Sequence, residues 1–81
     1  MTTTDVAAVA RRVRRAGGMA DVKRRALLAA LKHPDLVRAR LTVSGVLLEG
    51  PGGVISTHLS GGRGGESIGP LLRDLRRVGL A

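Results

Sequence analysis

Residues 41–60 restrict the fold more than any other part of the chain, because they contain two β-prone runs separated by a chain reversal. The reversal is the Gly-Pro-Gly-Gly segment 50–53, in which Pro fixes φ at one corner and Gly52 is expected to accept a positive φ at the next. Two such runs joined by four turn residues predict an antiparallel hairpin with Glu49 opposite Val54.

That register assigns each hairpin side chain to one of two sheet faces, because side chains alternate along a strand and opposed residues share a face. The face expected to join the core carries Val46, Leu48, Ile55, Thr57 and Leu59. The other face is half polar and carries Leu47, Glu49, Ser56, His58 and Ser60, with Gly45 opposite His58.

The segment 36–43 also alternates, and its polar side includes Arg38 and Arg40. The apolar parity then shifts by one residue at the Ser-Gly pair 44–45, which indicates a bulge, a bend or a tight turn. One compatible arrangement, which we favour, is a long strand bent at this pair. The other is a three-strand meander over residues 36–43, 46–49 and 54–60.

Helical periodicity appears on both sides of this β region. A first helix is predicted from a cap at Thr3 or Thr4 to the glycines at 17–18, with a buried stripe of Val6, Val9, Ala10 and Val13. A second runs from Ala20 or Asp21 to Lys32, and a last one from about Ser67 or Pro70 to Val78 before Gly79. With a flexible Gly-rich loop at 60–66, the chain is expected to form a single α+β domain over residues 1–81, with the C-terminal helix packed on the sheet.

The composition limits how such a domain is held together. The 81 residues include no Phe, Tyr, Trp or Cys, so the core must be aliphatic and neither a disulfide nor a thiolate metal site can form. Because small domains of this kind are marginally stable, we expect a homodimer or larger assembly. No cofactor is indicated. The chain has no apolar run long enough to cross a bilayer and no secretory signal, so we expect a cytoplasmic protein without a membrane partner.

The net charge of +8 predicts a polyanionic partner, nucleic acid first. The absence of aromatic side chains disfavours base stacking and leaves phosphate contacts to a DNA or RNA duplex. The predicted contacts are Arg11, Arg12, Arg14, Arg15, Arg38, Arg40 and Arg63. The alternative is that these arginines only solvate helix faces.

Two further groups of polar residues bear on function. Lys23, Arg24 and Arg25 fall in the first turn of the second helix, where cations oppose the helix dipole, and this mismatch favours a functional role. His58 is a candidate general base toward an RNA 2′-hydroxyl, although it has no carboxylate beside it in the predicted sheet. His33 shares no metal-ligand spacing with it, so no metal site is predicted.

The C-terminal half, with its Pro-Gly turn followed by Gly69-Pro-Leu-Leu-Arg-Asp-Leu-Arg-Arg-Val-Gly-Leu80, resembles the end of HicA-type toxins. The resemblance covers residues 36–81. It implies a small basic ribonuclease with a double-stranded-RNA-binding-domain-like fold and an antitoxin partner. The family's catalytic His follows Gly-Ser on the first strand, where this chain has Ser44-Gly45 and no His, so the likeness favours fold and nucleic-acid affinity over enzymatic activity.

Two other interpretations remain. Residues 20–31 and the closing Leu-Arg-Arg-Val-Gly-Leu resemble pieces of winged-helix regulators, but the hairpin precedes the last helix, which is the wrong order. The chain is also compatible with a protein-interaction module, either a homo-oligomer or an inhibitor of a partner, because Leu47, Val43 and Val54 are expected to form an exposed apolar patch.

Overall fold

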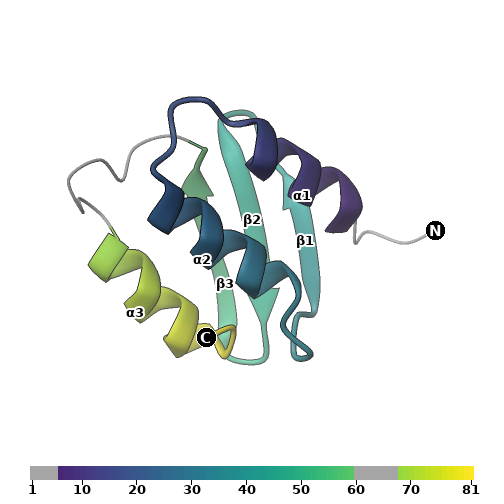
Figure 1. Cartoon of the computed structure of the whole chain (residues 1–81). Coiled ribbons are helices and arrows are strands. Elements are labelled where there is room, and N and C mark those ends of the chain that lie inside the picture. The colour runs from purple at the N-terminus through teal and green to yellow at the C-terminus, as the bar shows by residue number, and fades with distance from the viewer. Residues whose placement is uncertain (1–5, 60–67) are drawn as a thin grey trace.

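The computed structural model describes residues 6–59 and 68–81. Two helices, three strands and a final helix follow one another along the chain (Figure 1). Their bounds are α1 Val6–Arg15, α2 Asp21–Leu31, β1 Arg38–Leu41, β2 Gly45–Gly50, β3 Gly53–His58 and α3 Ile68–Val78. The α+β fold class and the C-terminal helix packed on the sheet are confirmed. The predicted caps at Thr3, Thr4 and Ser67 and the loop at 60–66 lie outside the described residues.

The three strands form an antiparallel sheet in the order β1-β2-β3. The predicted register between β2 and β3 is confirmed, with Glu49 opposite Val54 and Gly45 opposite His58. The inner face of the sheet therefore carries the residues that were expected to join the core. The outer face carries Arg38, Arg40 and His58.

The favoured single bent strand is wrong, because the chain reverses at residues 42–44 and β1 pairs with β2. Two hydrogen bonds close this turn: the Thr42 N–H donates to the Gly45 carbonyl (2.9 Å), and the Gly45 N–H donates to Thr42 Oγ1 (3.0 Å). A Cβ at Gly45 would lie 1.9 Å from the Thr57 carbonyl oxygen. The parity shift in the sequence thus marks a strand reversal at a site where only glycine fits.

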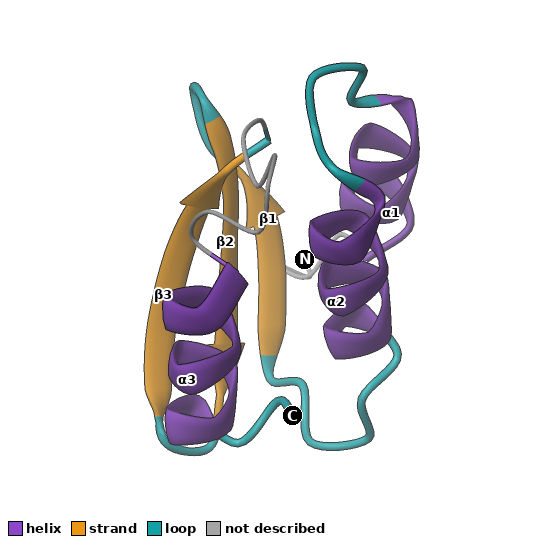
Figure 2. Cartoon of the chain, turned by 60° about the vertical axis from the view of Figure 1, so that its left-hand side comes forward, coloured by secondary structure: helices purple, strands orange, loops and turns teal. Residues whose placement is uncertain are grey.

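All three helices lie on the same side of the sheet (Figure 2). Helix α1 packs over β1, α3 packs over β3, and α2 contacts both other helices. The core between the two layers is aliphatic, as the composition requires. Its most deeply buried members are Val9, Val13, Leu27, Ala30, Ala39, Val46, Leu48, Leu75, Val78 and Leu80.

The Gly-rich turn between β2 and β3 packs against the C-terminal end of α3. The Gly52 N–H donates to the Val78 carbonyl (3.0 Å), and a Cβ on Gly52 would lie 2.4 Å from the Arg77 carbonyl oxygen. The positive φ of the turn occurs at Gly53 (141°) and not at Gly52 as predicted. Helix α3 ends at Val78 and is followed by Gly79, whose φ of 86° is the left-handed conformation that glycine favours.

Candidate nucleic-acid interface

Helix α1 is a basic helix held to the sheet by small side chains. Its predicted stripe is confirmed in that Val9 and Val13 are fully buried. The four remaining long side chains, those of Arg11, Arg12, Arg14 and Arg15, are exposed. The helix contains no acidic residue, and none of the three ion pairs found among the described residues involves it. Helix α1 therefore presents four guanidinium groups to solvent, and no carboxylate of the described residues pairs with them.

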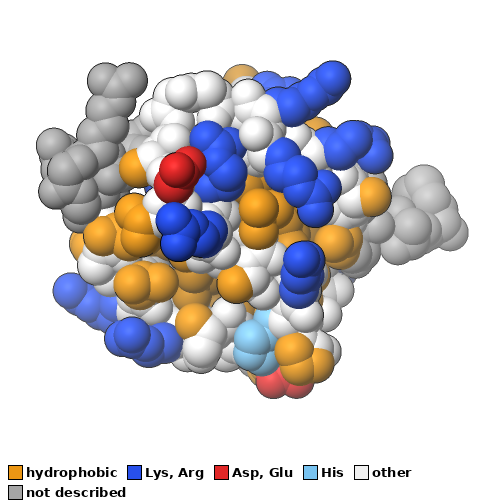
Figure 3. Space-filling model, viewed as in Figure 1, with side chains coloured by type: hydrophobic (Ala, Val, Ile, Leu, Met, Phe, Trp, Pro, Cys, Tyr) orange, Lys and Arg blue, Asp and Glu red, His pale blue; other side chains and the backbone are white. Residues whose placement is uncertain are grey.

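Helix α2 extends this positive surface. Exposed Arg25 belongs to α2, and exposed Lys32 directly follows it. Lys32 lines a groove of about 480 Å³ between the two helices together with Arg11 and Arg14. Figure 3 shows the blue Lys and Arg side chains bordering an orange apolar strip over α1 and α2. We call the exposed cations of α1 and α2, together with Lys32 after α2, the α1–α2 basic face: Arg11, Arg12, Arg14, Arg15, Arg25 and Lys32.

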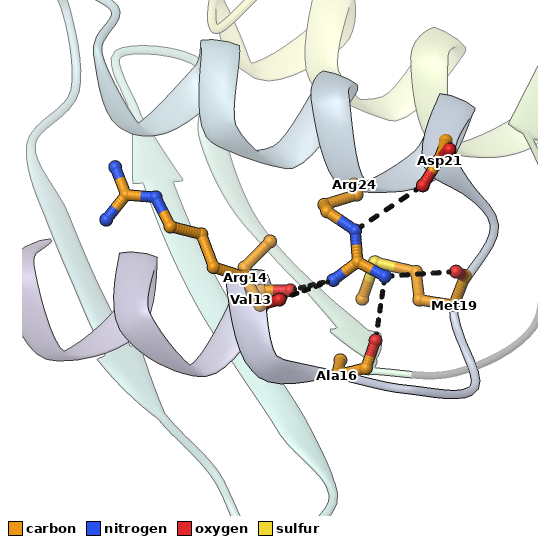
Figure 4. Close-up of polar contacts among 6 residues, drawn as sticks. All are labelled: Val13, Arg14, Ala16, Met19, Asp21 and Arg24. Atoms are coloured by element: carbon orange, nitrogen blue, oxygen red, sulfur yellow. Dashed lines mark hydrogen bonds and ion pairs between the residues drawn. The ribbon is translucent and has the colours of Figure 1, made fainter.

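Arg24, in the first turn of α2, has a structural role: it caps the C-terminal end of α1. Its guanidinium group donates hydrogen bonds to four carbonyl oxygens at the end of α1 and in the loop that follows (Figure 4). The acceptors belong to Val13, Arg14 (3.0 Å), Ala16 (2.8 Å) and Met19 (3.3 Å). These bonds satisfy helix-end carbonyls and place a cation at the negative pole of the α1 dipole.

The unfavourable position of Arg24 relative to its own helix is thus offset by a favourable position relative to the neighbouring helix. The sequence mismatch that favoured a functional role has, for Arg24, a structural explanation. Sequence reasoning missed it because the two helix ends meet only in the folded chain.

Lys23, the preceding cation, is buried, with 4% of its surface exposed. Burial lowers the pKa of its amine below the usual 10.5, because desolvation disfavours the charged form. A side chain in this position cannot reach a phosphate strand. Of the three cations in the first turn of α2, only Arg25 belongs to the α1–α2 basic face.

The predicted set of nucleic-acid contacts is divided between two faces of the molecule. Arg38 and Arg40 project from β1 on the outer face of the sheet, whereas the α1 arginines lie on the helical side. Arg38 Nε also lies 3.6 Å from Glu49 Oε1 on the adjacent strand. A single flat surface cannot contain both groups. Arg63 lies outside the described residues.

His58 lies exposed at the end of β3 on the outer sheet face, where the register placed it. Its neighbours on that face are Gly45, directly opposite, and Ser56, two residues earlier in the strand; neither supplies a carboxylate. The other histidine, His33, accepts a hydrogen bond at Nδ1 from the Asp35 N–H (3.1 Å) and so fixes the turn after α2. Within residues 6–59 and 68–81, no three side chains of the metal-binding types come together.

The predicted apolar patch on the outer sheet face is smaller than expected. Leu47 is half-buried and Val54 is 48% exposed on neighbouring strands. Val43, in contrast, is fully exposed in the turn beyond the end of β1. The patch therefore reduces to two side chains among polar ones.

In the described part of the chain, every helix is too short or too polar to traverse a lipid bilayer. Comparisons with protein-family models, curated proteins and solved structures found no match.

Proposed function

We propose that this protein binds duplex nucleic acid by contacting phosphates with the α1–α2 basic face. The observation that carries the proposal is that α1 displays four exposed arginines and no acidic residue. Elsewhere, Arg24, Arg38 and Arg77 each lie beside a carboxylate, at 3.8, 3.6 and 3.7 Å. Among residues 6–59 and 68–81, none of these ion pairs involves an α1 arginine.

The chemistry of the surface favours phosphate contacts over base recognition. Arg binds phosphate oxygens through paired N–H donors, and each contact releases counterions from the nucleic acid. Arg11 and Arg15 are about one helical turn apart, so both can contact the same phosphate strand. Since the chain has no aromatic residue on which bases could stack, we expect binding with little dependence on base sequence.

The test is a salt titration of binding to duplex DNA and duplex RNA. If the four α1 arginines each contact a phosphate, log K falls against log salt with a slope of about −3.6, at about −0.9 per contact. Replacing Arg12 and Arg15 by Gln should make that slope shallower by about 1.8. The matched control replaces Arg73 and Arg76 on α3, which are also exposed, and should leave the slope nearly unchanged.

Two results would count against the proposal: affinity that does not respond to salt, or equal losses from the α1 and α3 double variants. Circular dichroism of each variant separates loss of binding from loss of folding. A difference between DNA and RNA identifies the duplex. We propose a cytoplasmic location as part of this function.

A second candidate function is self-association through the uncovered outer face of the sheet. Leu47 and Val54 supply its apolar contacts, and the Arg38–Glu49 pair supplies charges of both signs. Light scattering over a concentration series tests it, since a monomer at every concentration rules it out. The ribonuclease interpretation of His58 stays a prediction. We do not include it in the proposed function, because its sheet neighbours provide no second catalytic group.

A further inference from the structure

The groove between α1 and α2 has a property that phosphate binding does not require. Its floor is apolar and consists of side chains from both helices: Val6, Ala10, Leu28 and Leu31. Its rim is formed by Arg11, Arg14 and Lys32, with no acidic residue among the lining side chains. A phosphate backbone would use the rim and leave the floor in water.

We infer that this groove docks an acidic amphipathic helix from a partner protein. An apolar stripe on such a helix would cover the groove floor, and carboxylates flanking the stripe would meet the cationic rim. Charge complementarity requires a partner with negative charge, because every ionisable group that lines the groove is basic. This inference goes beyond the proposed function and does not depend on it.

The dimensions of the groove set the pattern of the partner. The lining residues of α1 extend from Val6 to Arg14, which is about 12 Å along a helix axis at 1.5 Å per residue. A helix lying along this length presents apolar residues at i, i+4 and i+7, with the outer two about 10.5 Å apart. Asp or Glu on both sides of the stripe would then approach the rim cations.

A docked helix and a nucleic-acid duplex would exclude one another, because Arg11 and Arg14 belong to both the groove rim and the α1–α2 basic face. Such a partner would act as a competitor of the duplex. Arg12 and Arg15 do not line the groove, which makes the two binding modes separable by mutation.

The probe is a capped peptide of about 14 residues with Leu at i, i+4 and i+7 and Glu on both flanks, labelled for fluorescence anisotropy. One control peptide replaces each Leu by Gln and keeps the charge, and another replaces each Glu by Lys. We expect the acidic amphipathic peptide to bind at least about tenfold more tightly than either control. The 81-residue chain is used without nucleic acid, so failure of the proposed function does not affect the result.

Two matched pairs of variants locate the site. Ala7→Glu places a carboxylate in the groove, whereas Ala29→Glu makes the same change at an exposed position that does not line it. Arg14→Gln removes a rim cation, whereas Arg12→Gln removes an α1 cation outside the rim. We expect Ala7→Glu to weaken peptide binding by about tenfold and Arg14→Gln by about fivefold, with changes below about twofold in both controls.

Equal binding of the Leu-free acidic peptide would overturn the inference, because it would reduce the interaction to charge alone. Equal losses from Arg12→Gln and Arg14→Gln would overturn it as well, by placing the peptide outside the groove. A third contrary outcome is that the acidic amphipathic peptide does not bind while laurate, a single-chain anionic amphiphile, binds saturably. That result would assign the groove to such an amphiphile instead of a helix. Circular dichroism confirms that each variant is folded before it is compared.

Discussion

Replacement of Arg24 by Met tests the contact between the end of α1 and the start of α2. Met keeps much of the unbranched stem but removes all the guanidinium donors. The Arg24 side chain is only 21% exposed, and its hydrogen bonds to the carbonyls of Val13 and Ala16 are part-buried. The substitution therefore removes a cap from α1 without creating a large cavity.

The expected loss follows from those hydrogen bonds. A hydrogen bond to a charged group contributes about 1.5–3 kcal/mol, and a cation at a helix C-terminus about 0.3–1 kcal/mol. The ion pair with Asp21 adds less than about 1 kcal/mol, because the Asp21 side chain is 82% exposed and the separation is 3.8 Å. Since the contributions are not additive and water can reach some of the carbonyls, we expect a loss of about 2–3 kcal/mol in the free energy of unfolding.

The assay is urea unfolding followed by far-UV circular dichroism, because the chain has no Trp, Tyr or Phe for fluorescence. Arg25→Met is the matched control, since Arg25 is the adjacent residue and is exposed. It should change the free energy of unfolding by less than about 0.5 kcal/mol. If the two variants lose equal stability, the cap contributes nothing beyond the general effect of removing an Arg, and the reasoning fails.

Two further predictions concern buried positions. Because the pKa of Lys23 in the folded chain is below 10.5, the unfolded chain binds more protons between that lowered pKa and 10.5. The free energy of unfolding should therefore rise with pH across this window. Lys23→Met should flatten this rise in stability with pH, whereas Lys32→Met, at an exposed position, should retain it. If the rise persists in Lys23→Met, the buried Lys23 amine is not its cause. Gly45→Ala forces a Cβ against the Thr57 carbonyl and should cost about 1–3 kcal/mol. Gly69→Ala is the control, because a Cβ there meets nothing within 4 Å and the change replaces a helical glycine. It should be neutral or stabilising by about 0.5 kcal/mol. Equal urea-unfolding midpoints for the Gly45→Ala and Gly69→Ala variants would refute the steric argument.

The hairpin and the helix stripes were predictable because they depend on local periodicity. A four-residue reversal fixes the pairing of Glu49 with Val54, and every other β2–β3 pair follows by counting. The identity of the strand before Gly45 was not predictable in the same way. A parity shift at a Ser-Gly pair is produced equally by a bend and by a reversal, and only the pairing of β1 with β2 separates the two.

The candidate interface was half predictable for a related reason. Net charge and the density of Arg in α1 are properties of the sequence, and the structure places these arginines on the surface. The sequence does not show which cations meet protein atoms in the folded chain. Arg24 bonds to carbonyls of another helix, and Arg38 meets a carboxylate on another strand, so both contacts depend on tertiary structure.

The composition of α1 is the strongest argument that its surface serves a partner. Packing over β1 requires only the stripe that contains Val9 and Val13. Helix propensity would be met equally well on the solvent side by Ala, Gln, Glu or Lys, and a mixture of charges would stabilise the helix through i, i+4 pairs. Four arginines without one acidic residue forgo those pairs and place like charges one turn apart. Cations in the last turn suit the helix dipole, so folding accounts for part of this composition. The proposed anionic partner, which would contact several guanidinium groups at once, accounts for the absence of compensating acidic residues.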